Sequence, residues 1–391
     1  MTAHHATPIL PPATLGVLGG GQLGRYFVMA AKTMGFRVVV LEPDPAAPAG
    51  AVADEHLVAA YDDPGALAHL AATCAVVTTE FENPPASALD ELAAHTLVRP
   101  APAAIAIAQD RRLEKRFLAG AGIPVGPFAV VESVADLSAP LFERGVTFPA
   151  IVKTARLGYD GKGQRTVHDD AELCEAWHDL GQVACVVEQR LPLDREVSVV
   201  LARGVDGECA VFPTVANTHV GGILDLTVVP APDADDDHHR AADLAVAVAE
   251  ALDYVGVLAV ELFVVGGELV VNELAPRPHN SGHWTLDAAA TSQFEQQVRA
   301  VCGLPLGAPA ATASGVAMVN LLGDEWADGA PDWAAALADP AAHLHLYGKA
   351  EPRPGRKMGH LTVSAPTPSE AATVALALRR SARGAASPES H

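Results

Sequence analysis

The stretch "VLAVELFVVGGELVVNELAP" (Val257–Pro276) contains two runs of β-branched and aliphatic residues on either side of Gly266-Gly267. Such runs favour β-strands, and a pair of glycines between them is typical of a tight hairpin turn. The stretch therefore predicts two neighbouring antiparallel strands. It indicates an α+β arrangement for this part of the chain rather than a parallel α/β sheet.

The register of this hairpin decides whether its two central carboxylates face each other. A three-residue loop, Gly266–Glu268, places Glu261 opposite Glu273, and two carboxylates facing each other across a strand pair are destabilising. A divalent cation between them removes the repulsion, and their oxygen atoms suit magnesium. A strict two-residue turn instead pairs Glu261 with Asn272 and turns Glu273 to the other face, which leaves two ordinary glutamates.

Polar and basic residues gather in two segments beyond the hairpin. "PRPHNSGHWT" (276–285) follows it directly, and "RPGRKMGH" (353–360) lies far downstream. A basic run is most often a solvated face, but in a chain of net charge −21 a basic loop beside polar donors suits a phosphate pocket. The side chains concerned are Arg277, His279, Asn280, Ser281, His283, Arg353, Arg356, Lys357 and His360.

A glycine-containing loop precedes the hairpin in "VKTARLGYDGKGQRTV" (Val152–Val167). Lys153 ends a predicted strand, three glycines follow, and a second strand comes after them. Glycines allow backbone N–H groups to approach a phosphate closely. The loop is not of the Walker A type, because Gln164 stands where lysine is required and a strand follows instead of a helix. A flexible hairpin tip is the alternative.

The N-terminal stretch "VLGGGQLGRYFVMAAKTMGFRVVVLEPD" (Val17–Asp44) contains a G-x-G-x-x-G motif that begins at Gly19. Glu42 follows roughly 20 residues later, where a dinucleotide-binding fold holds a ribose. Strand and helix patterns alternate here, which predicts a parallel sheet with helices on its faces. The motif alone favours a nicotinamide-dependent dehydrogenase, and the rest of the chain must decide.

The middle of the chain shows a different organisation. Asn83, before two prolines, predicts a capped helix start, residues 99–107 resemble a linker, and a helix is expected at 109–118. The next strands follow one another without helices of crossover length, which predicts an antiparallel α+β unit. Residues 381–391 are expected to be a disordered tail. The expected strands are 148–155, 164–167, 184–190 and 195–203.

Composition limits the class of protein. The chain has 391 residues, 50% of them hydrophobic, which suits two or three domains with sizeable cores. A net charge of −21 argues against general affinity for nucleic acid or for an anionic membrane. The five dispersed cysteines fit reduced thiols better than a disulfide or zinc framework. No signal peptide pattern precedes the first strand, so a soluble cytoplasmic protein is expected.

Six blocks together carry a resemblance to a known family. From about Leu15 to about Thr362 the sequence resembles the N5-carboxyaminoimidazole ribonucleotide synthetases, ATP-grasp enzymes of bacterial and fungal purine biosynthesis. The segments "NELAPRPHNSGHWT" and "PGRKMGH" are the most specific to the family, and the opening glycine motif is the least specific. The blocks are "GGGQLGR", "VKTARLGYDGKGQ", "VEQRLPLDREVSVV", "NTHVGGILDLTVVPA", "VNELAPRPHNSGHWT" and "HLYGKAEPRPGRKMGHL", in this order.

The resemblance implies a fold of mixed α/β and α+β class. A Rossmann-like pre-grasp domain is expected at 1–108, and an ATP-grasp domain at 109–305 with a lid subdomain at about 120–190. A small C-terminal domain at 306–380 completes the substrate site, and the tail follows. In this family the glycine turn faces the acceptor substrate, so the resemblance argues against a dehydrogenase, with Glu42 merely the polar end of a strand. The helix N-terminus at the turn is expected to be able to serve a phosphate.

The resemblance also implies the reaction. ATP phosphorylates bicarbonate to carboxyphosphate, and CO2 is delivered to the exocyclic amine of 5-aminoimidazole ribonucleotide. The cofactors implied are ATP and Mg²⁺. The partners implied are these two substrates and a second copy of the chain in a homodimer, with no nucleic acid and no membrane.

Site residues follow from the resemblance by position. Lys153, Arg277, Tyr159 and Asp160 are the implied catalytic residues, and Glu261 and Glu273 the implied magnesium ligands. The neighbouring Arg112 leaves the choice of Arg111 open. The implied nucleotide contacts are Arg111, Lys153, the flap Gly158, Tyr159, Asp160, Gly161, Lys162, Gly163 and Gln164, the hinge Glu188, Gln189, Arg190 and Leu191, and Glu196, His219, Asn272 and Glu273. The implied acceptor contacts are Gln22, Leu23, Glu80, His279, Asn280, Ser281, Arg353, Arg356 and Lys357.

Three other functions remain open at this point. Another ATP-grasp carboxylase or formyl transferase could act on a neighbouring purine intermediate. A nicotinamide-dependent oxidoreductase is disfavoured by the antiparallel middle of the chain. A regulatory module that binds nucleotide without turnover would not need both Glu261 and Glu273.

Overall fold

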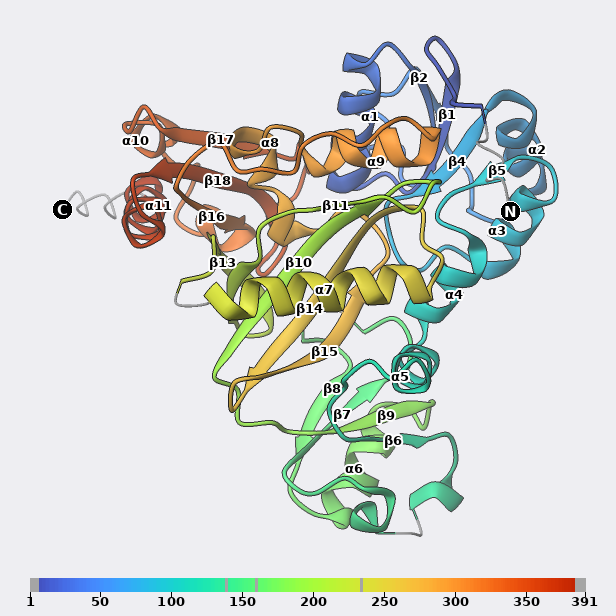
Figure 1. Ribbon diagram of the computed structural model, residues 1–391, viewed down its shortest axis with the longest axis vertical. Helices are drawn as coiled ribbons and strands as arrows, with labels where there is room; N and C mark the ends of the chain where they lie inside the picture. The colour runs from blue at the N-terminus through green and yellow to red at the C-terminus, as the bar shows by residue number, and fades with distance from the viewer. Residues whose placement is uncertain (1–6, 138–139, 159–160, 233–234, 384–391) are drawn as a thin grey trace.

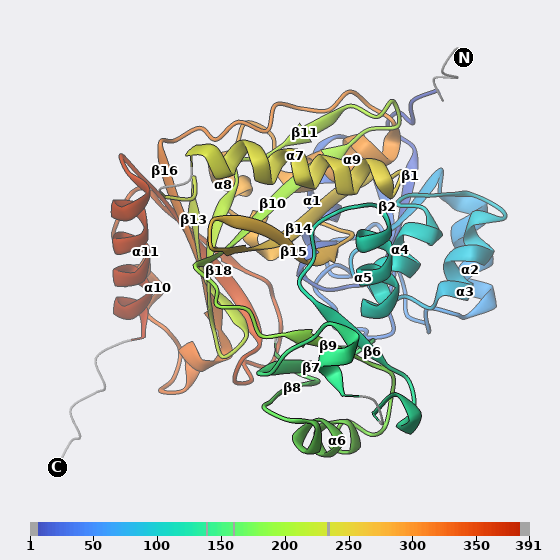
Figure 2. The same cartoon turned by 60° about the horizontal axis from the view of Figure 1, so that its bottom comes forward.

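The computed structural model describes residues 7–137, 140–158, 161–232 and 235–383. These residues form three β-sheets. Figure 1 shows two of the sheets in one larger body, with the smallest sheet set apart at the lower end of the molecule. Figure 2, viewed from that end, shows the small unit projecting from beneath the larger body.

The N-terminal sheet is five-stranded and parallel, in the order β3-β2-β1-β4-β5. Phe27 and Val28 of α1 (Gln22–Thr33) pack on one face, and Leu67 and Leu70 of α2 pack on the other. The parallel sheet predicted from the strand–helix alternation is confirmed. The remaining elements are β1 (Thr14–Leu18), β2 (Arg37–Leu41), β3 (Glu55–Leu57), α2 (Pro64–Thr73), β4 (Val76–Thr79), α3 (Ala86–Ala93), β5 (Leu97–Val98) and α4 (Pro102–Gln109).

Two local predictions in this region are wrong. Helix α3 begins after Pro85 and has no side-chain cap, so Asn83 is not its cap. Residues 99–107 are not a linker, because most of them belong to α4, which starts with a proline at a position where helices tolerate it. Ala104 and Ile105 of α4 are buried. The low charge of this segment therefore reflects burial and not flexibility.

A nine-stranded antiparallel sheet forms the centre of the molecule, in the order β15-β14-β10-β12-β13-β16-β18-β17 with β11 on β10. Its antiparallel pairing confirms the α+β prediction. The pairing of β13 with β16 continues the sheet from the part of the chain before residue 306 into the part after it. Its strands are β10 (Arg195–Arg203), β11 (Cys209–Val211), β12 (Val215–Val220), β13 (Ile223–Val229), β14 (Gly256–Val265), β15 (Glu268–Ala275), β16 (Gly315–Leu322), β17 (Ala342–Leu346) and β18 (Lys357–Ala365).

Helices cover the central sheet and join it to the N-terminal one. α7 (Asp235–Ala251) packs against β10 and β14, and α11 (Pro368–Ala382) against β16 and β18. α9 (Gln293–Cys302) lies beside α1, and its Val298 and Val301 enter the core of the N-terminal sheet (Figure 1). The two larger sheets are thus held in one body. The remaining short helices are α8 (Thr285–Ala288) and α10 (Trp333–Ala336), with 3-10 turns at Val134–Leu137, Leu141–Arg144, Asn280–Gly282 and Gly323–Trp326.

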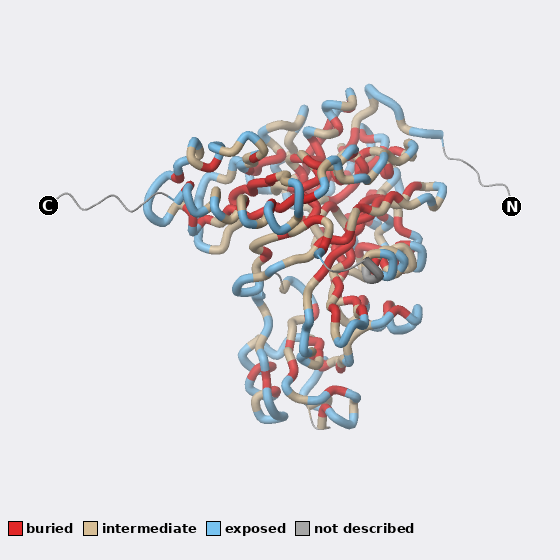
Figure 3. Tube along the Cα trace, turned by 60° about the vertical axis from the view of Figure 1, so that its left-hand side comes forward, coloured by how far each residue is buried: buried red, intermediate tan, exposed pale blue. Residues whose placement is uncertain are grey.

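The small sheet is four-stranded, antiparallel and ordered β6-β9-β7-β8, and it has its own core. In Figure 3 this unit carries short buried stretches between exposed ones. The prediction that no helix separates its strands is wrong, because α6 (Asp170–Asp179) lies between β8 and β9. Asp169 caps α6 by accepting a hydrogen bond from the Glu172 amide, a start signal visible in the sequence. The other elements are α5 (Arg111–Gly120), β6 (Phe128–Val131), β7 (Ala150–Thr154), β8 (Gln164–Val167) and β9 (Cys185–Gln189).

The hairpin of β14 and β15 pairs Glu261 with Glu273 as predicted, but by a different route. The turn contains only Gly266-Gly267, both with positive φ (57° and 78°), so the predicted three-residue loop is wrong. A register shift next to Glu261 leaves Asn272 as an extra residue in β15. Because a bulge inserts one residue and re-aims side chains, a two-residue turn and facing carboxylates coexist.

The end of the chain differs slightly from the expected tail. Ser381 and Ala382 belong to α11, and residues 384–391 of the predicted tail lie outside the described residues. Among the helices of the described residues, none has the length and apolar character needed to cross a membrane.

Candidate active site

A cavity of about 380 Å³ lies where the small sheet faces the central sheet. β7 supplies Lys153, β10 supplies Glu196, and the hairpin supplies both glutamates. Arg111, at the start of α5, lines this cavity, whereas Arg112 turns to Asp110 and Glu132. The predicted nucleotide and metal residues in its wall are Arg111, Lys153, Gly158, Gly161, Lys162, Gln164, Glu196, His219, Glu261, Asn272 and Glu273.

A second cavity, of about 660 Å³, adjoins the first. The glycine turn and the segment 349–357 form its walls, and its lining includes the predicted acceptor residues Gln22, Leu23, Glu80, Arg353 and Arg356. Because six residues line both cavities, the two spaces meet. These shared residues are Glu82, Lys162, Arg277, His279, Asn280 and Lys357.

Some predicted residues do not line either cavity. Ser281 is buried behind the wall, where its hydroxyl is 2.8 Å from both the Ser198 hydroxyl and His279 Nδ1. Tyr159 and Asp160 lie outside the described residues. Gly163, Glu188, Gln189, Arg190 and Leu191 are also absent from both linings.

The hairpin bulge brings three oxygen-bearing side chains to the first cavity. Glu261, Asn272 and Glu273 all line it, and the Asn272 carbonyl oxygen Oδ1 is buried without a hydrogen-bond partner. Glu261 accepts from His279 Nε2 at 3.0 Å, and Glu273 accepts from Arg111 Nη2 at 3.1 Å. Two carboxylates and an unpaired amide oxygen are hard donors, so this set fits a magnesium ion.

The pKa values of the two glutamates move in opposite directions. Burial alone would raise the pKa of Glu261, but the hydrogen bond and charge of His279 outweigh it and lower the pKa to about 2. For Glu273, burial and the nearby Glu261 charge raise the pKa, against the opposing charge of Arg111. A divalent cation beside the pair would relieve this repulsion and favour the ionised form of Glu273.

Two buried charges, Glu188 and Lys115, stand behind the first cavity beside Lys153 of its wall. The Glu188 carboxylate lies 2.7 Å from Lys153 Nζ and 3.4 Å from Lys115 Nζ. Burial would raise the pKa of Glu188, but Lys153 and then Lys115 outweigh it and lower the pKa to about 2. Glu188 therefore stays ionised and fixes Lys153 at the cavity wall.

His219 and Glu196 face each other across β12 and β10, with 2.8 Å between Nδ1 and the carboxylate. Burial lowers the pKa of His219, but the hydrogen bond and charge of Glu196 raise it overall. Both side chains line the first cavity. The pair thus presents a polar, charge-balanced wall opposite Lys153.

Backbone amides of the glycine turn donate hydrogen bonds to two carboxylates of the protein itself. The two oxygens of Glu80 accept hydrogen bonds from the Gly21 and Gly24 amides at 2.8 and 2.9 Å. Glu42 accepts from the Gly20 amide at 2.8 Å and from the Tyr61 hydroxyl at 2.5 Å. Three amides of the turn are therefore engaged by carboxylates, and Glu42 is more than the polar end of a strand. The expectation that this helix N-terminus serves a phosphate stays a prediction for the Gln22 and Leu23 amides.

This arrangement predicts that the protein does not bind NADH. Three of the backbone donors that would hold a pyrophosphate are engaged, and bringing a phosphate beside two carboxylates is electrostatically unfavourable. Titration with NADH up to about 1 mM, followed by nicotinamide fluorescence, should show no saturable change. An ATP titration of the same sample, followed by tryptophan fluorescence, serves as the positive control, and saturable NADH binding would contradict the prediction.

Three family models match the chain in order. They are a ribonucleotide synthetase preATP-grasp domain at residues 12–109, an ATP-grasp domain at 116–294, and a phosphoribosylaminoimidazole carboxylase C-terminal domain at 316–373. The N5-carboxyaminoimidazole ribonucleotide synthase of Brucella melitensis is 47% identical over 359 residues, which cover 91% of this chain and 97% of the relative. The chain belongs to the N5-carboxyaminoimidazole ribonucleotide synthase family. It is an ATP-grasp ligase, and the fold expected from the resemblance is confirmed.

Solved structures of this synthase family match the whole chain. The N5-carboxyaminoimidazole synthetase of Staphylococcus aureus, complexed with ADP, is 35% identical with a TM-score of 0.88 and covers 96% of this chain and 99% of its own. The Aspergillus clavatus synthase, in complex with ADP and 5-aminoimidazole ribonucleotide, is 30% identical with a TM-score of 0.84 and covers 94% and 99%. The similarity therefore includes all three sheets.

Two residues of the candidate active site, Lys115 and Glu82, were not predicted from the sequence. Lys115 follows Arg111 by one helical turn on α5, and its Nζ donates to the backbone carbonyl of Asn272 at 2.7 Å, which supports the bulge. The spacing of four residues could have placed it beside Arg111. Glu82 lines both cavities and pairs with Arg277. Its position two residues after Glu80, in the loop between β4 and α3, was the available signal.

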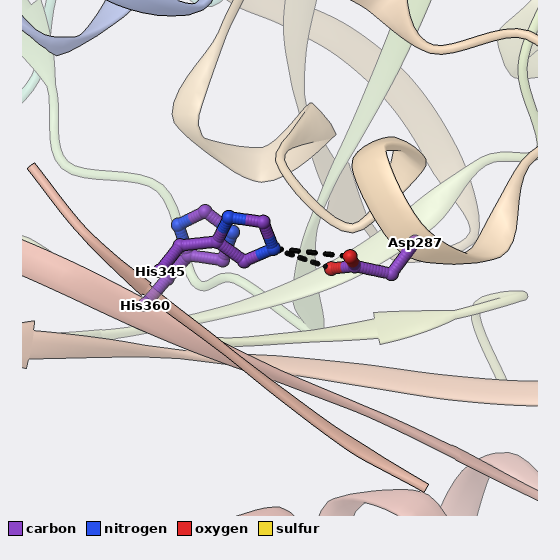
Figure 4. A group of neighbouring side chains, drawn as sticks. All are labelled: Asp287, His345 and His360. Atoms are coloured by element: carbon purple, nitrogen blue, oxygen red, sulfur yellow. Dashed lines mark hydrogen bonds and ion pairs between the residues drawn. The ribbon is translucent and has the colours of Figure 1, made fainter.

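One further group resembles a metal site but is better explained by packing. Asp287, His345 and His360 are the group of potential metal ligands found among the described residues. Figure 4 shows His345 Nε2 aimed at both Asp287 oxygens, at 2.9 and 3.0 Å. The His345 and His360 rings are stacked at 4.5 Å and 11°. Because ring nitrogen lone pairs lie in the ring plane, stacked imidazoles do not converge on one ion. The group instead joins β17 and β18 to α8.

Proposed function

We propose that this ligase carboxylates 5-aminoimidazole ribonucleotide at its exocyclic amine, using ATP and bicarbonate and passing through carboxyphosphate. The observation that carries the proposal is the meeting of two cavities at a shared wall of polar and cationic residues. One cavity suits a nucleotide with its metal, and the other suits a phosphorylated acceptor. The Aspergillus clavatus relative, solved with ADP and 5-aminoimidazole ribonucleotide, supports the assignment of both ligands.

The first cavity is assigned to ATP. Arg111 and Lys153, which line it, would bind its phosphates. The family resemblance assigns the loop 158–164, including Tyr159 and Asp160, as the flap and residues 188–191 as the adenine hinge. Glu261, Asn272 and Glu273 would hold magnesium, which would neutralise charge on the transferred phosphoryl group. Phosphoryl transfer needs cations and donors around the phosphate more than it needs a covalent nucleophile.

The second cavity is assigned to the acceptor ribonucleotide. Arg353, Arg356 and Lys357 line it and supply positive charge for the ribose phosphate. Gln22 and Leu23, at the start of α1, line the opposite wall near the carboxylate of Glu80. This arrangement would direct the exocyclic amine toward the shared wall.

Carboxyl transfer is assigned to the shared wall. A bicarbonate oxygen attacks the γ-phosphorus of ATP, which gives ADP and carboxyphosphate. Cleavage of the carbon–oxygen bond then releases phosphate and CO2, and the acceptor amine attacks the carbon and loses a proton. Arg277, His279 and Asn280 stand where the anionic intermediate would form. Keeping water away matters here, because carboxyphosphate hydrolyses readily.

Several finer features belong to the same proposal. We assign the domains to residues 1–108, 109–305 and 306–380, which agrees with the spacing of the three family models. A homodimer is proposed from the family resemblance alone, and a cytoplasmic location from the dispersed cysteines and the N-terminal sequence. Size-exclusion chromatography with light scattering tests the oligomeric state.

The test of the function is ADP release with MgATP and bicarbonate, measured with and without 5-aminoimidazole ribonucleotide. We expect a stimulation of at least about tenfold by the nucleotide, together with loss of its free amine. Stimulation by glycinamide ribonucleotide instead would keep the ligase and overturn the substrate assignment. Absence of stimulation by any acceptor would favour a nucleotide-binding module.

A further inference from the structure

Glu82 is the single carboxylate among the six described residues that line both cavities. It lies between β4 and α3, and it accepts a hydrogen bond from Arg277 Nη2. The two residues belong to different parts of the chain, because Arg277 follows the hairpin strand β15. The pair therefore ties the N-terminal unit to the central sheet at the point where the cavities meet.

The Arg277 guanidinium is held from two sides. Its Nη1 donates to the Pro278 carbonyl at 3.1 Å, and its Nη2 donates to Glu82. Only 16% of the Arg277 side chain is exposed, so few alternative orientations are open to it. An arginine fixed by a carboxylate keeps its planar donors in one orientation, which a flexible side chain does not.

The same short segment also holds the acceptor wall. Glu80 accepts hydrogen bonds from the Gly21 and Gly24 amides, next to Gln22 and Leu23 in the second cavity. Two residues later, Glu82 holds Arg277. The segment 80–82 thus sets the distance between the acceptor wall and the guanidinium.

A role for Glu82 as the proton acceptor fits the environment less well. Burial would raise the pKa of Glu82, but the charge and hydrogen bond of Arg277 outweigh it and lower the pKa overall. A carboxylate already engaged by a guanidinium and with a lowered pKa is a weak base. Its contribution is therefore to place Arg277.

We propose that Glu82 is a positioning residue that fixes Arg277 between the two cavities and thereby couples ATP cleavage to carboxylation of the acceptor. The inference rests on the proposed function. Without the Glu82 charge, Arg277 loses its fixed orientation. Carboxyphosphate is then hydrolysed before the acceptor amine captures the CO2 that it releases. ATP cleavage itself uses Arg111, Lys153 and the hairpin carboxylates. Among the described residues Glu82 forms no hydrogen bond or ion pair with these side chains, and its charge acts on Arg111 and Glu273 only through space.

The test compares Glu82→Gln with the wild type by the ratio of carboxylated product to ADP released. Glutamine keeps the shape of the side chain but removes its charge, so the ratio of product to ADP should fall by at least about fivefold. The KM for bicarbonate should rise, and the KM for ATP should stay within about twofold of the wild-type value. Glu82→Asp keeps the charge and should give an intermediate ratio. Glu295→Gln, which removes another Glu–Arg pair on α9 (2.6 Å), should leave the ratio unchanged.

The outcomes separate the two proposals. A ratio in Glu82→Gln equal to that of the wild type, even with a lower kcat, overturns the positioning role. Equal falls in Glu82→Gln and Glu295→Gln also overturn it, because the effect would then be structural. If the wild type itself shows no acceptor-dependent ADP release, the proposed function fails, and the coupling role fails with it.

Discussion

Replacing Glu273 with glutamine is expected to lower the kcat for acceptor-stimulated ADP release by at least about a hundredfold. The substitution keeps the shape of the side chain but removes one of two carboxylates that face each other at the hairpin bulge. On the proposed function, the magnesium ion would then have one carboxylate charge fewer to bind it, and Arg111 loses the partner that holds it at 3.1 Å. Binding of the nucleotide phosphates would thereby be weakened in two ways.

The measurement is steady-state ADP release at saturating acceptor over a range of magnesium concentrations. Glu273→Gln should need more magnesium and still fail to reach the wild-type rate. Glu268→Gln is the matched control, because Glu268 begins the same strand but is exposed and pairs with Arg240 at 2.8 Å. Retention of more than about one-tenth of the wild-type kcat in Glu273→Gln would contradict a role for this carboxylate in binding magnesium.

The hairpin shows how far sequence alone can lead. The pairing of Glu261 with Glu273 was predicted from a three-residue loop, and the pairing is confirmed although that loop is wrong. A two-residue turn and a bulge at Asn272 give the same pairing as a three-residue loop without a bulge. Local residue preferences do not distinguish these solutions, because the bulge is stabilised by Lys115 from a distant helix.

The glycine turn shows where a short motif is insufficient. G-x-G-x-x-G describes a backbone shape that permits close approach, but it does not specify what approaches. Here the carboxylates of Glu42 and Glu80 occupy the amides. Their positions depend on the whole sheet, since Glu80 lies 56 residues from Gly24 in sequence. Likewise, residues 102–109 form a helix because proline suits their first position and alanine favours helices, and this helix is buried on both larger units through Ile105 and Ala104.

Replacing Glu188 with glutamine is expected to lower the free energy of unfolding at pH 7 by about 3–5 kcal/mol. The Glu188 carboxylate compensates Lys153 and Lys115, whose side chains are 13% and 3% exposed. Removing the carboxylate charge leaves two nearly buried ammonium groups without their counter-charge. Urea unfolding followed by tryptophan fluorescence measures the loss, since Trp177 is buried in the core of the small sheet. Asp179→Asn, at an exposed ion pair with Arg165, should change stability by less than about 0.5 kcal/mol.

The pH dependence of this loss tests its ionic origin. The pKa of Glu188 is about 2 in the folded protein and 4.5 ordinarily, a difference equivalent to about 3 kcal/mol. Because the folded-state pKa is the lower one, ionisation of Glu188 stabilises fully above pH 4.5 and progressively less as the pH falls toward 2. The wild type should therefore lose stability over this interval more steeply than Glu188→Gln, and the gap between them should narrow. A gap that is the same at pH 7 and pH 3 would mean that packing, and not charge, is what Glu188 contributes.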